Sequence, residues 1–246
     1  MKAMILAAGL GTRLMPLTRN KPKALIEVGG YTLLELTIRY LLKFGVDHVV
    51  LNVHHFADQI IAYLENKKGF GINYSISDES EMLLDTGGAV LHASKFLRDE
   101  DFFILMGVDV LTGLDLGAMI RYHSEHNPLV TLAVKDRETS RSLLFDKNMF
   151  LVGWRDNANG TTRGINAGKA EFALGFSTIH LIDRSIFSLI NETGVFSIID
   201  LYLRLMDTSR IMGFRHDDTP WMEFGRLDRI KELPKTTEFV NLTRKL

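Results

Sequence analysis

Apolar and polar positions follow two alternating periods through the first half of the chain. Continuous apolar runs, typical of strands buried on both faces, cover residues 3–8, 48–53, 72–76 and 102–106. Helix-period segments lie between them, at residues 32–45, 57–66 and 88–96. This alternation predicts a doubly wound sheet with helices on both faces. We therefore expect a single-domain, Rossmann-like three-layer α/β/α fold around a mostly parallel mixed sheet.

The second half of the chain is less regular. Strands are predicted at residues 130–134, 149–154 and 171–181, and helices at residues 185–190 and 198–206. The Asn- and Gly-rich stretch 156–169 is predicted to be a mobile loop. We find no repeat or linker that divides the chain, so residues 1–246 are expected to form one domain.

Composition narrows the classes of partner. Lys plus Arg number 29 and Asp plus Glu 30, for a net charge of −1, which argues against a nucleic-acid or membrane-surface binder. Hydrophobic residues make up 46% of the chain, enough for a packed interior, but no stretch approaches the roughly 20 apolar residues of a membrane span. The chain has no cysteine, which excludes disulfides and thiolate chemistry and fits a cytoplasmic location.

The segment 9–23, which follows the first predicted strand, carries the clearest chemistry. Glycines after a buried strand let backbone N–H groups approach an anion, and Arg13 and Lys23 add cationic donors. In such sheets, ligands bind at the carboxyl ends of the strands. A dinucleotide fingerprint would need a third glycine where Leu14 stands, and a Walker A loop would need a final Gly-Lys-Ser/Thr. Both generic phosphate motifs are therefore excluded.

Residues 6–18 read L-A-A-G-L-G-T-R-L-M-P-L-T, and residues 21–23 read K-P-K. This segment resembles the signature loop of the sugar-nucleotide pyrophosphorylases, L-x-A-G-x-G-T-R-L-x-P-L-T followed by K-P-K. The resemblance is closest to short bacterial N-acetylmuramate-1-phosphate uridylyltransferases and mannose-1-phosphate guanylyltransferase-like proteins. It implies the nucleotide-diphospho-sugar transferase fold without a C-terminal β-helix. It also implies a nucleotide-binding half over about residues 1–115 and an acceptor-binding half over about residues 116–246.

The resemblance also implies roles for individual residues. Arg13 would hold the β- and γ-phosphates, and Lys23 would bridge the α-phosphate and the acceptor phosphate. The remaining nucleotide-binding residues would be Ala8, Gly9, Gly11, Thr12, Asp85, Thr86, Gly87 and Gly88. Those from Asp85 to Gly88 match a D-T-G-G turn against the nucleobase. The same turn is also compatible with a plain helix start.

A metal site is implied because nucleotidyl transfer needs a divalent ion to offset phosphate charge. Asp109 follows the strand at 102–106 and is expected to bind Mg²⁺, or Mn²⁺, unless it only caps a loop. Glu223 stands where the resemblance places an aspartate, in the segment W-M-E-F-G-R at residues 221–226. It is expected to be the second ligand, and the alternative is a surface carboxylate paired with Arg226 or Arg229.

Five residues are expected to contact the acceptor or its surroundings: Asn52, Glu79, Glu171, Ser177 and Thr178. Ser177 and Thr178 belong to a segment that resembles the acceptor strand F-[ST]-G-[IV], with threonine in place of glycine. The histidine pairs, at 54–55 and at 123 and 126, lack a further ligand at metal spacing and are expected to be structural.

The implied reaction joins an NTP and a sugar 1-phosphate to give an NDP-sugar and pyrophosphate. UTP or GTP is the expected nucleotide. The acceptor phosphate is already anionic at neutral pH, so positioning and charge stabilisation by Arg13, Lys23 and the metal ion are sufficient without a general base. A cytidylyltransferase acting on phosphocholine or a similar alcohol, and a non-catalytic nucleotide-sugar binding protein, stay open. The sequence also leaves open which nucleobase and which acceptor are used, and whether the protein is a homodimer.

Overall fold

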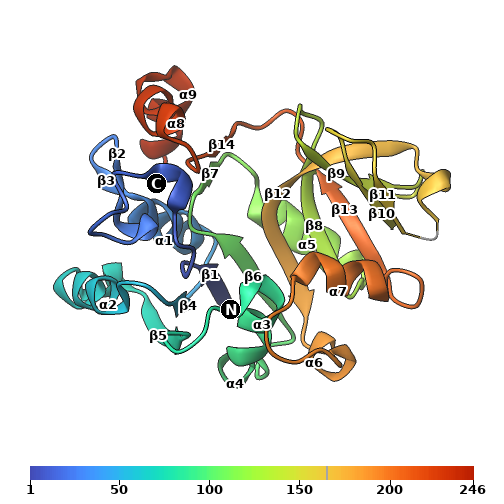
Figure 1. Ribbon diagram of the computed structural model, residues 1–246, viewed down its shortest axis with the longest axis horizontal. Helices are drawn as coiled ribbons and strands as arrows, with labels where there is room; N and C mark the ends of the chain where they lie inside the picture. Colours follow the sequence, from blue (N-terminus) through green and yellow to red (C-terminus); the bar gives the residue numbers. More distant parts are fainter. Residues whose placement is uncertain (165) are drawn as a thin grey trace.

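A mixed sheet forms the centre of the computed structural model, which describes residues 1–164 and 166–246 (Figure 1). One path through it follows the order β11-β10-β9-β12-β6-β1-β4-β5, and β8 joins β12 to β13. Its strands are β1 (Lys2–Leu6), β4 (His48–Val53), β5 (Asn73–Asp78), β6 (Phe102–Gly107), β8 (Val130–Lys135), β9 (Arg141–Phe145), β10 (Leu151–Asp156), β11 (Thr162–Arg163), β12 (Phe172–Asp183) and β13 (Ile211–Arg215). Two short ladders pair β2 (Glu27–Val28) with β3 (Tyr31–Thr32) and β7 (Val110–Thr112) with β14 (Trp221–Glu223).

Strands β5, β4, β1 and β6 are mutually parallel, and β4, β1 and β6 are buried on both faces. Ile5 of β1 and Leu51 of β4 pack into the core on one face, whereas Met4 and Val50 pack into the core on the other. Apolar residues at every position of a strand are what a sheet covered on both faces requires. The predicted three-layer α/β/α fold with a mostly parallel mixed sheet is confirmed.

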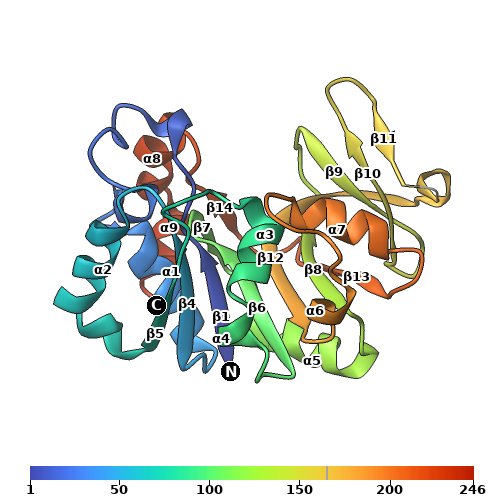
Figure 2. The same ribbon diagram turned by 60° about the horizontal axis from the view of Figure 1, so that its bottom comes forward.

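Helices cover both faces of the sheet (Figures 1 and 2). One face carries α1 (Leu33–Lys43), α2 (Ala57–Asn66) and α5 (Leu116–His126). The other carries α3 (Asp85–His92), α4 (Ser94–Leu97), α6 (Ile186–Leu189) and α7 (Ile198–Leu205). Helix α1 begins as its sequence predicts, because the Thr32 side chain accepts a hydrogen bond from the Glu35 amide at 3.1 Å. The single helix predicted over residues 88–96 is instead two helices, α3 and α4.

The second half of the sheet departs further from the sequence prediction. Strand β12 pairs antiparallel with β9 at its start and with β6 and β8 at its end, and its register shifts between Phe176 and His180. Strands β9 and β13 were not predicted. The stretch 156–169, predicted to be a mobile loop, contains the short strand β11, which pairs with the preceding strand β10. Residue 165 of this stretch lies outside the described residues. These segments become strands because they pair with segments distant in the sequence, and the local apolar pattern does not reveal such pairing.

The end of the chain returns to the first half. Helices α8 (Leu227–Glu232) and α9 (Thr237–Thr243) lie beside the loop that follows β1 (Figures 1 and 2). Phe239 and Leu242 share a buried cluster with Leu14 and Leu33. The predicted boundary at about residue 115 does not separate two packing units, and the assignment of the two halves to nucleotide and acceptor stays a prediction.

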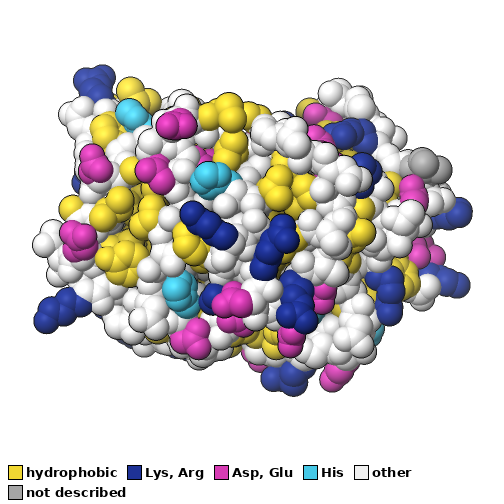
Figure 3. Space-filling model, turned by 90° about the horizontal axis from the view of Figure 1, so that it is seen from below, with side chains coloured by type: hydrophobic (Ala, Val, Ile, Leu, Met, Phe, Trp, Pro, Cys, Tyr) yellow, Lys and Arg dark blue, Asp and Glu magenta, His cyan; other side chains and the backbone are white. Residues whose placement is uncertain are grey.

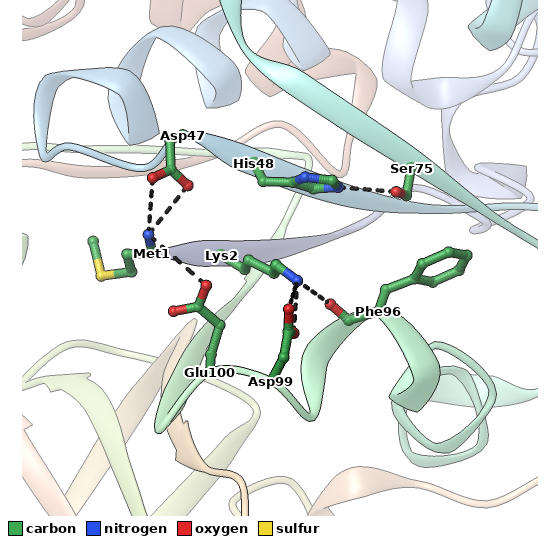
Figure 4. A network of polar contacts seen from close by, with 8 residues as sticks. All are labelled: Met1, Lys2, Asp47, His48, Ser75, Phe96, Asp99 and Glu100. Atoms are coloured by element: carbon green, nitrogen blue, oxygen red, sulfur yellow. Dashed lines mark hydrogen bonds and ion pairs between the residues drawn. The ribbon is translucent and has the colours of Figure 1, made fainter.

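The amino ends of the parallel strands are closed by ionic contacts (Figure 4). The Met1 ammonium donates to Asp47 at 3.1 Å, and the Lys2 ammonium donates to Asp99 at 2.6 Å and to the Phe96 carbonyl at 2.9 Å. Because these groups are satisfied by one another, this edge is structural. The carboxyl ends of the same strands are left to form a ligand site.

Charges of both signs are interspersed on the face of the molecule seen from below (Figure 3). This distribution agrees with the near-zero net charge of −1. Among the described helices, none is long and apolar enough to cross a membrane.

Candidate active site

A cleft of about 670 Å³ opens beside the carboxyl ends of β6 and the middle of β12. Among the predicted site residues, it brings together Arg13, Asp85, Asp109, Thr178 and Glu223. The other lining residues are Arg137, Thr139, Ser140, Arg141, Ser142, Leu143, Trp154, Arg163, Phe176, Ser197, Ile199, Asp200 and Trp221. Ligand sites of parallel sheets lie at this edge, as the sequence predicts.

The glycine-rich loop after β1 is stabilised by contacts between its own residues. Gly11 has a φ of 63°, and a Cβ there would stand 2.8 Å from the Thr18 methyl group, so glycine is required on both counts. The Thr18 hydroxyl donates to the Gly11 carbonyl at 2.9 Å. Leu14 is fully buried, whereas the Arg13 side chain is 69% exposed. The loop therefore presents Arg13, together with the open Gly9 and Thr12, to an incoming anion.

Lys23 and Asp109 form the best-shielded ion pair of the site. The Lys23 ammonium donates to Oδ2 of Asp109, and both side chains are less than one-fifth exposed. Lys23 stands at the start of a 3₁₀ turn, and Asp109 lies between β6 and β7. Because the pair is half-buried, its attraction is screened less than that of a surface pair.

Glu223 reaches the cleft through the pairing of β14 with β7. Glu223 stands opposite Val110 in this ladder, and the Phe224 amide donates to the Asp109 carbonyl at 2.9 Å. The Glu223 carboxylate lies 3.9 Å from the Arg13 guanidinium. The alternative pairing of Glu223 with Arg226 is wrong, because Arg226 contacts Asp228 at 3.1 Å. Two carboxylates from segments far apart in the sequence thus lie at one end of the cleft.

The Asp85–Gly88 turn forms the first turn of α3 and packs against a distant loop. The amides of Gly87 and Gly88 both donate to the Phe196 carbonyl, at 2.9 and 3.2 Å. A Cβ on Gly87 would stand 2.4 Å from the Phe196 ring. The plain helix start is therefore present, and these glycines serve packing. Of the four residues, Asp85 lines the cleft.

Asn52 and Glu79 lie beneath the site and are both buried. Asn52 accepts from the Ala7 amide at 2.7 Å and donates to Glu79 at 3.0 Å, and Glu79 accepts from the Leu84 amide at 3.1 Å. This chain of hydrogen bonds ties the loop after β1 to the turn at Asp85. The structure does not place either side chain in the cleft lining, so their predicted contact with the acceptor stays a prediction.

The far wall of the cleft is cationic, which sequence reasoning missed. The Arg137 guanidinium stacks 4.0 Å from the centre of the Trp221 ring and donates to the Phe176 carbonyl at 2.8 Å. Burial lowers the pKa of Arg137 from its usual value. Arg141 and Arg163 line the same wall, and Arg163 pairs with Asp200 at 2.7 Å. The cluster of polar residues at 136–141, directly after β8, is the signal that could have revealed it.

The acceptor strand β12 contributes Thr178 to the cleft, whereas Ser177 and Glu171 lie elsewhere. Ser177 is buried with its hydroxyl 2.7 Å from Nε2 of His216, and Glu171 is exposed beyond the start of β12. Thr178 has a φ of 58°. Its hydroxyl oxygen is buried and has no hydrogen-bond partner among the described residues.

The histidines predicted to be structural have structural surroundings. His123 lies 2.8 Å from the Thr131 hydroxyl, and burial lowers its pKa to about 4. His54 contacts the Glu79 carbonyl at 2.6 Å. Within the part of the chain that the structure describes, no three His, Asp or Glu side chains gather as a metal site. The metal-ligand roles of Asp109 and Glu223 stay predictions.

Comparison with known proteins now decides the family. The model of the nucleotidyl transferase family matches residues 2–143. The N-acetylmuramate alpha-1-phosphate uridylyltransferase of Caulobacter vibrioides is 32% identical over 231 residues, which cover 91% of each chain. This chain belongs to the nucleotidyl transferase family.

Other relatives and structures agree with that membership. The mannose-1-phosphate guanylyltransferase catalytic subunit beta of Xenopus tropicalis is 35% identical over 54% of this transferase and 38% of its own length. A putative glucose-1-phosphate thymidylyltransferase from Bacillus anthracis shares the fold, with a TM-score of 0.81 at 16% identity, over 97% of this chain and 95% of that one. The predicted sugar-1-phosphate nucleotidyltransferase activity and its fold are confirmed at the level of the family.

Proposed function

We propose that the protein transfers UMP from UTP to N-acetylmuramate 1-phosphate, or to a sugar 1-phosphate that carries a similar carboxylate. Pyrophosphate is the second product. The observation that carries this proposal is the division of the cleft into two cationic regions. One contains Arg13 and the carboxylates of Asp109 and Glu223, and the other contains Arg137 and Arg141. Lys23 does not itself line the cleft, but it pairs with Asp109, which does.

The first region suits the triphosphate and its metal ion. Arg13 offers a planar fork of donors for the leaving β- and γ-phosphates, and Lys23 offers a compact charge near the reacting α-phosphorus. Each cation lies near a carboxylate: Arg13 is 3.9 Å from Glu223, and Lys23 pairs with Asp109. Arrival of the triphosphate draws the cations to its oxygens and frees both carboxylates. The ion pairs thus keep four charged groups in place until the substrate binds.

Mg²⁺ fits the same two carboxylates, with Mn²⁺ as a substitute. Mg²⁺ is usually held by one or two carboxylates together with substrate phosphates and water, so a two-carboxylate site is sufficient. Asp109 and Glu223 belong to neighbouring strand ends, and both line the cleft. Bound there, the ion would neutralise charge on the triphosphate during displacement. The longer side chain of Glu223 gives it the reach to act from the exposed rim.

The second region suits an acidic acceptor. A neutral sugar 1-phosphate presents one anionic group, which we assign to Lys23. A second anion on the sugar would meet Arg137, which is fixed by the Trp221 ring, and the exposed Arg141. Guanidinium groups bind carboxylates in a bidentate manner, which gives both affinity and orientation. N-acetylmuramate carries such a carboxylate, and its uridylyltransferases match this chain over nearly its full length.

The reaction on these residues is an in-line attack by an acceptor phosphate oxygen on the α-phosphorus of UTP. A P–O bond forms there while the bond to the β-phosphate oxygen breaks, and pyrophosphate departs against Arg13. The acceptor phosphate is anionic at neutral pH, so no residue needs to remove a proton. Catalysis comes from alignment of the two phosphates and from stabilisation of the negative charge. These reactants fit a cytoplasmic enzyme, and the location stays a prediction.

A pyrophosphate-release screen tests the proposal. UTP, GTP, CTP and dTTP are each combined with N-acetylmuramate 1-phosphate, N-acetylglucosamine 1-phosphate, mannose 1-phosphate and phosphocholine. We expect kcat/KM to be highest for UTP with N-acetylmuramate 1-phosphate, by at least about tenfold over the acceptor without the carboxylate, the value of one good charge-assisted contact. Preference for GTP with mannose 1-phosphate, or for CTP with phosphocholine, would replace this assignment. Nucleotide binding without pyrophosphate release from any pair would favour a binding protein.

A further inference from the structure

Thr178 combines a costly backbone conformation with an unsatisfied hydroxyl group. Its φ of 58° lies in the left-handed region, where a β-branched residue is strained and glycine is not. Its Oγ1 is buried without a hydrogen-bond partner among the described residues. Each feature destabilises the folded state, and strained residues of this kind gather at functional sites. The side chain of Thr178 therefore requires an explanation beyond packing.

The position of Thr178 in the sheet places it beside the reacting groups. The antiparallel ladder between β12 and β6 ends with Ile179 opposite Met106. Thr178 is the next residue of β12, and Gly107 is the next residue of β6. Asp109 follows two positions later. In the order β1-β6-β12, this puts Thr178 on the far side of Asp109 from the glycine-rich loop.

Gly107 provides an opening between Thr178 and Asp109. A Cβ on Gly107 would stand 3.1 Å from Oδ1 of Asp109 and 3.3 Å from Oγ1 of Thr178. The φ of Gly107 is not among the positive values, so the backbone here accepts other residues. Glycine leaves free of any side chain a space that both a hydroxyl oxygen and a carboxylate oxygen adjoin.

Asp109 has different partners for its two oxygens. Oδ2 accepts from the Lys23 ammonium, and Oδ1 is the oxygen that faces the opening at Gly107. When a triphosphate draws Lys23 away, the carboxylate loses the donor that holds its orientation. The hydroxyl of Thr178 adjoins the same opening and has no other partner among the described residues, so it is available to replace that donor.

We propose that Thr178 is a positioning residue for Asp109. Its hydroxyl donates to Oδ1 across the opening at Gly107 once substrate has engaged Lys23, and this bond fixes the carboxylate for the divalent ion. The inference rests on the proposed function, since it takes Asp109 as a metal ligand. Hydrogen bonds to a ligating carboxylate typically change metal affinity by about 10- to 100-fold.

The test measures Mn²⁺ binding as well as activity. Free Mn²⁺ is followed by its electron paramagnetic resonance signal in the presence of the protein and a non-hydrolysable UTP analogue. Thr178→Val removes the hydroxyl and keeps the shape, and we expect it to weaken Mn²⁺ binding about tenfold. Gly107→Ala closes the opening and should weaken binding to a similar extent. Thr178→Ser should stay within about twofold of the parent, because the hydroxyl is retained.

The double variant and the kinetics separate this role from others. If both changes break one contact, Gly107→Ala should add little to Thr178→Val. Turnover of Thr178→Val should recover at saturating Mn²⁺, with the acceptor KM unchanged. A raised acceptor KM in Thr178→Val at saturating Mn²⁺ would show that the hydroxyl binds the acceptor and would overturn the proposal. Mn²⁺ affinity in Thr178→Val equal to that of the unmodified protein would also overturn it.

Matched controls lie outside the cleft. Gly117→Ala places a Cβ 3.1 Å from Oδ1 of Asp115, the same kind of crowding at the start of α5. Thr131→Val removes a buried hydroxyl whose partner is His123. Neither should change Mn²⁺ affinity. Asp109→Asn tests the underlying assignment of Asp109 as a metal ligand. If this variant binds Mn²⁺ as tightly as the unmodified protein, Asp109 is not a ligand. If Asp109→Asn loses Mn²⁺ binding but Thr178→Val keeps it, only the role of Thr178 is refuted.

Discussion

The two sides of the cleft hold their cations in different ways. On the nucleotide side, Lys23 and Arg13 rest against Asp109 and Glu223, from elements far apart in the sequence. On the acceptor side, Arg137 is held by an aromatic ring and a backbone carbonyl, and it has no carboxylate partner among the described residues. The first side can exchange cation partners when phosphate and metal arrive together. The second side keeps a fixed guanidinium group that makes no direct ion pair among the described residues, and we propose that it meets an anionic ligand.

This difference shows how charge pairing relates to function. Paired cations and carboxylates near a site must separate before they act, so their ligands bind in a coupled manner. A guanidinium fixed by stacking loses little conformational freedom when an anion arrives, which favours selective recognition. The nucleotide side is therefore expected to govern turnover, and the acceptor side to govern substrate choice. The predictions below test that division.

The largest effect is expected from Asp109→Ala. It removes the proposed metal ligand and leaves Lys23 without its carboxylate, so kcat for pyrophosphate release should fall by roughly a thousandfold or more. The measurement is Mg²⁺-dependent turnover at saturating UTP and acceptor, with circular dichroism to verify folding. Turnover close to that of the unmodified protein would exclude Asp109 from the mechanism. It would also contradict the expectation that the nucleotide side of the cleft governs turnover.

Lys23→Ala should come next and should act mainly on kcat. In the proposed mechanism the ammonium stabilises charge that develops during transfer, so we expect a roughly hundredfold fall in kcat with a smaller change in the KM for UTP. Steady-state kinetics with each substrate varied in turn provide the measurement. If the loss appeared in KM alone, Lys23 would serve only ground-state binding.

Arg141→Gln should change selectivity more than turnover. We expect the KM for N-acetylmuramate 1-phosphate to rise about tenfold, the cost of losing one charge-assisted contact, while kcat stays within about twofold. N-acetylglucosamine 1-phosphate serves as the control acceptor and should be affected little. An equal rise for both acceptors would show that Arg141 does not recognise the carboxylate.

Glu223→Asp should have a modest effect. The carboxylate remains but is shorter by one methylene, and its contact with Arg13 is already long, at 3.9 Å, and partly exposed. We expect the Mg²⁺ concentration for half-maximal activity to change by less than about tenfold, in contrast to a large rise for Glu223→Ala. Indistinguishable behaviour of Glu223→Ala and the parent would exclude Glu223 as a ligand.

The free energy of unfolding should fall below neutral pH because of three buried histidines in the second half of the chain. Burial lowers the pKa of His123 and His216 to about 4 and that of His180 to about 3, below the unfolded value of 6.5. These neutral rings contribute stability above pH 6.5, and that stability is lost as the pH falls towards their folded values. Each adds a slope of at most about 1.4 kcal/mol per pH unit within this window. Urea unfolding between pH 7.5 and 5 should show this fall, and His180→Gln should reduce its slope; an unchanged slope would contradict the assignment.

The sequence alone determined the parallel half of the fold and pointed to its candidate phosphate-binding loop. Short apolar strands alternating with helices have few alternative arrangements, and Gly11, Arg13 and Lys23 stand within one continuous segment. Asp109 could be found for the same reason, since it directly follows a buried strand.

Only the tertiary structure decided how the distant parts meet. The β7–β14 ladder brings Glu223 beside Asp109 across more than a hundred residues, and no local pattern encodes that pairing. The bend in β12 gives Thr178 its strained conformation, and Arg137 reaches the cleft by stacking on Trp221. Asn52 and Glu79 carry polar groups of the type that bind ligands, yet burial directs those groups to one another. Residue type follows from sequence, but exposure and partners follow from packing between segments that sequence reasoning cannot align.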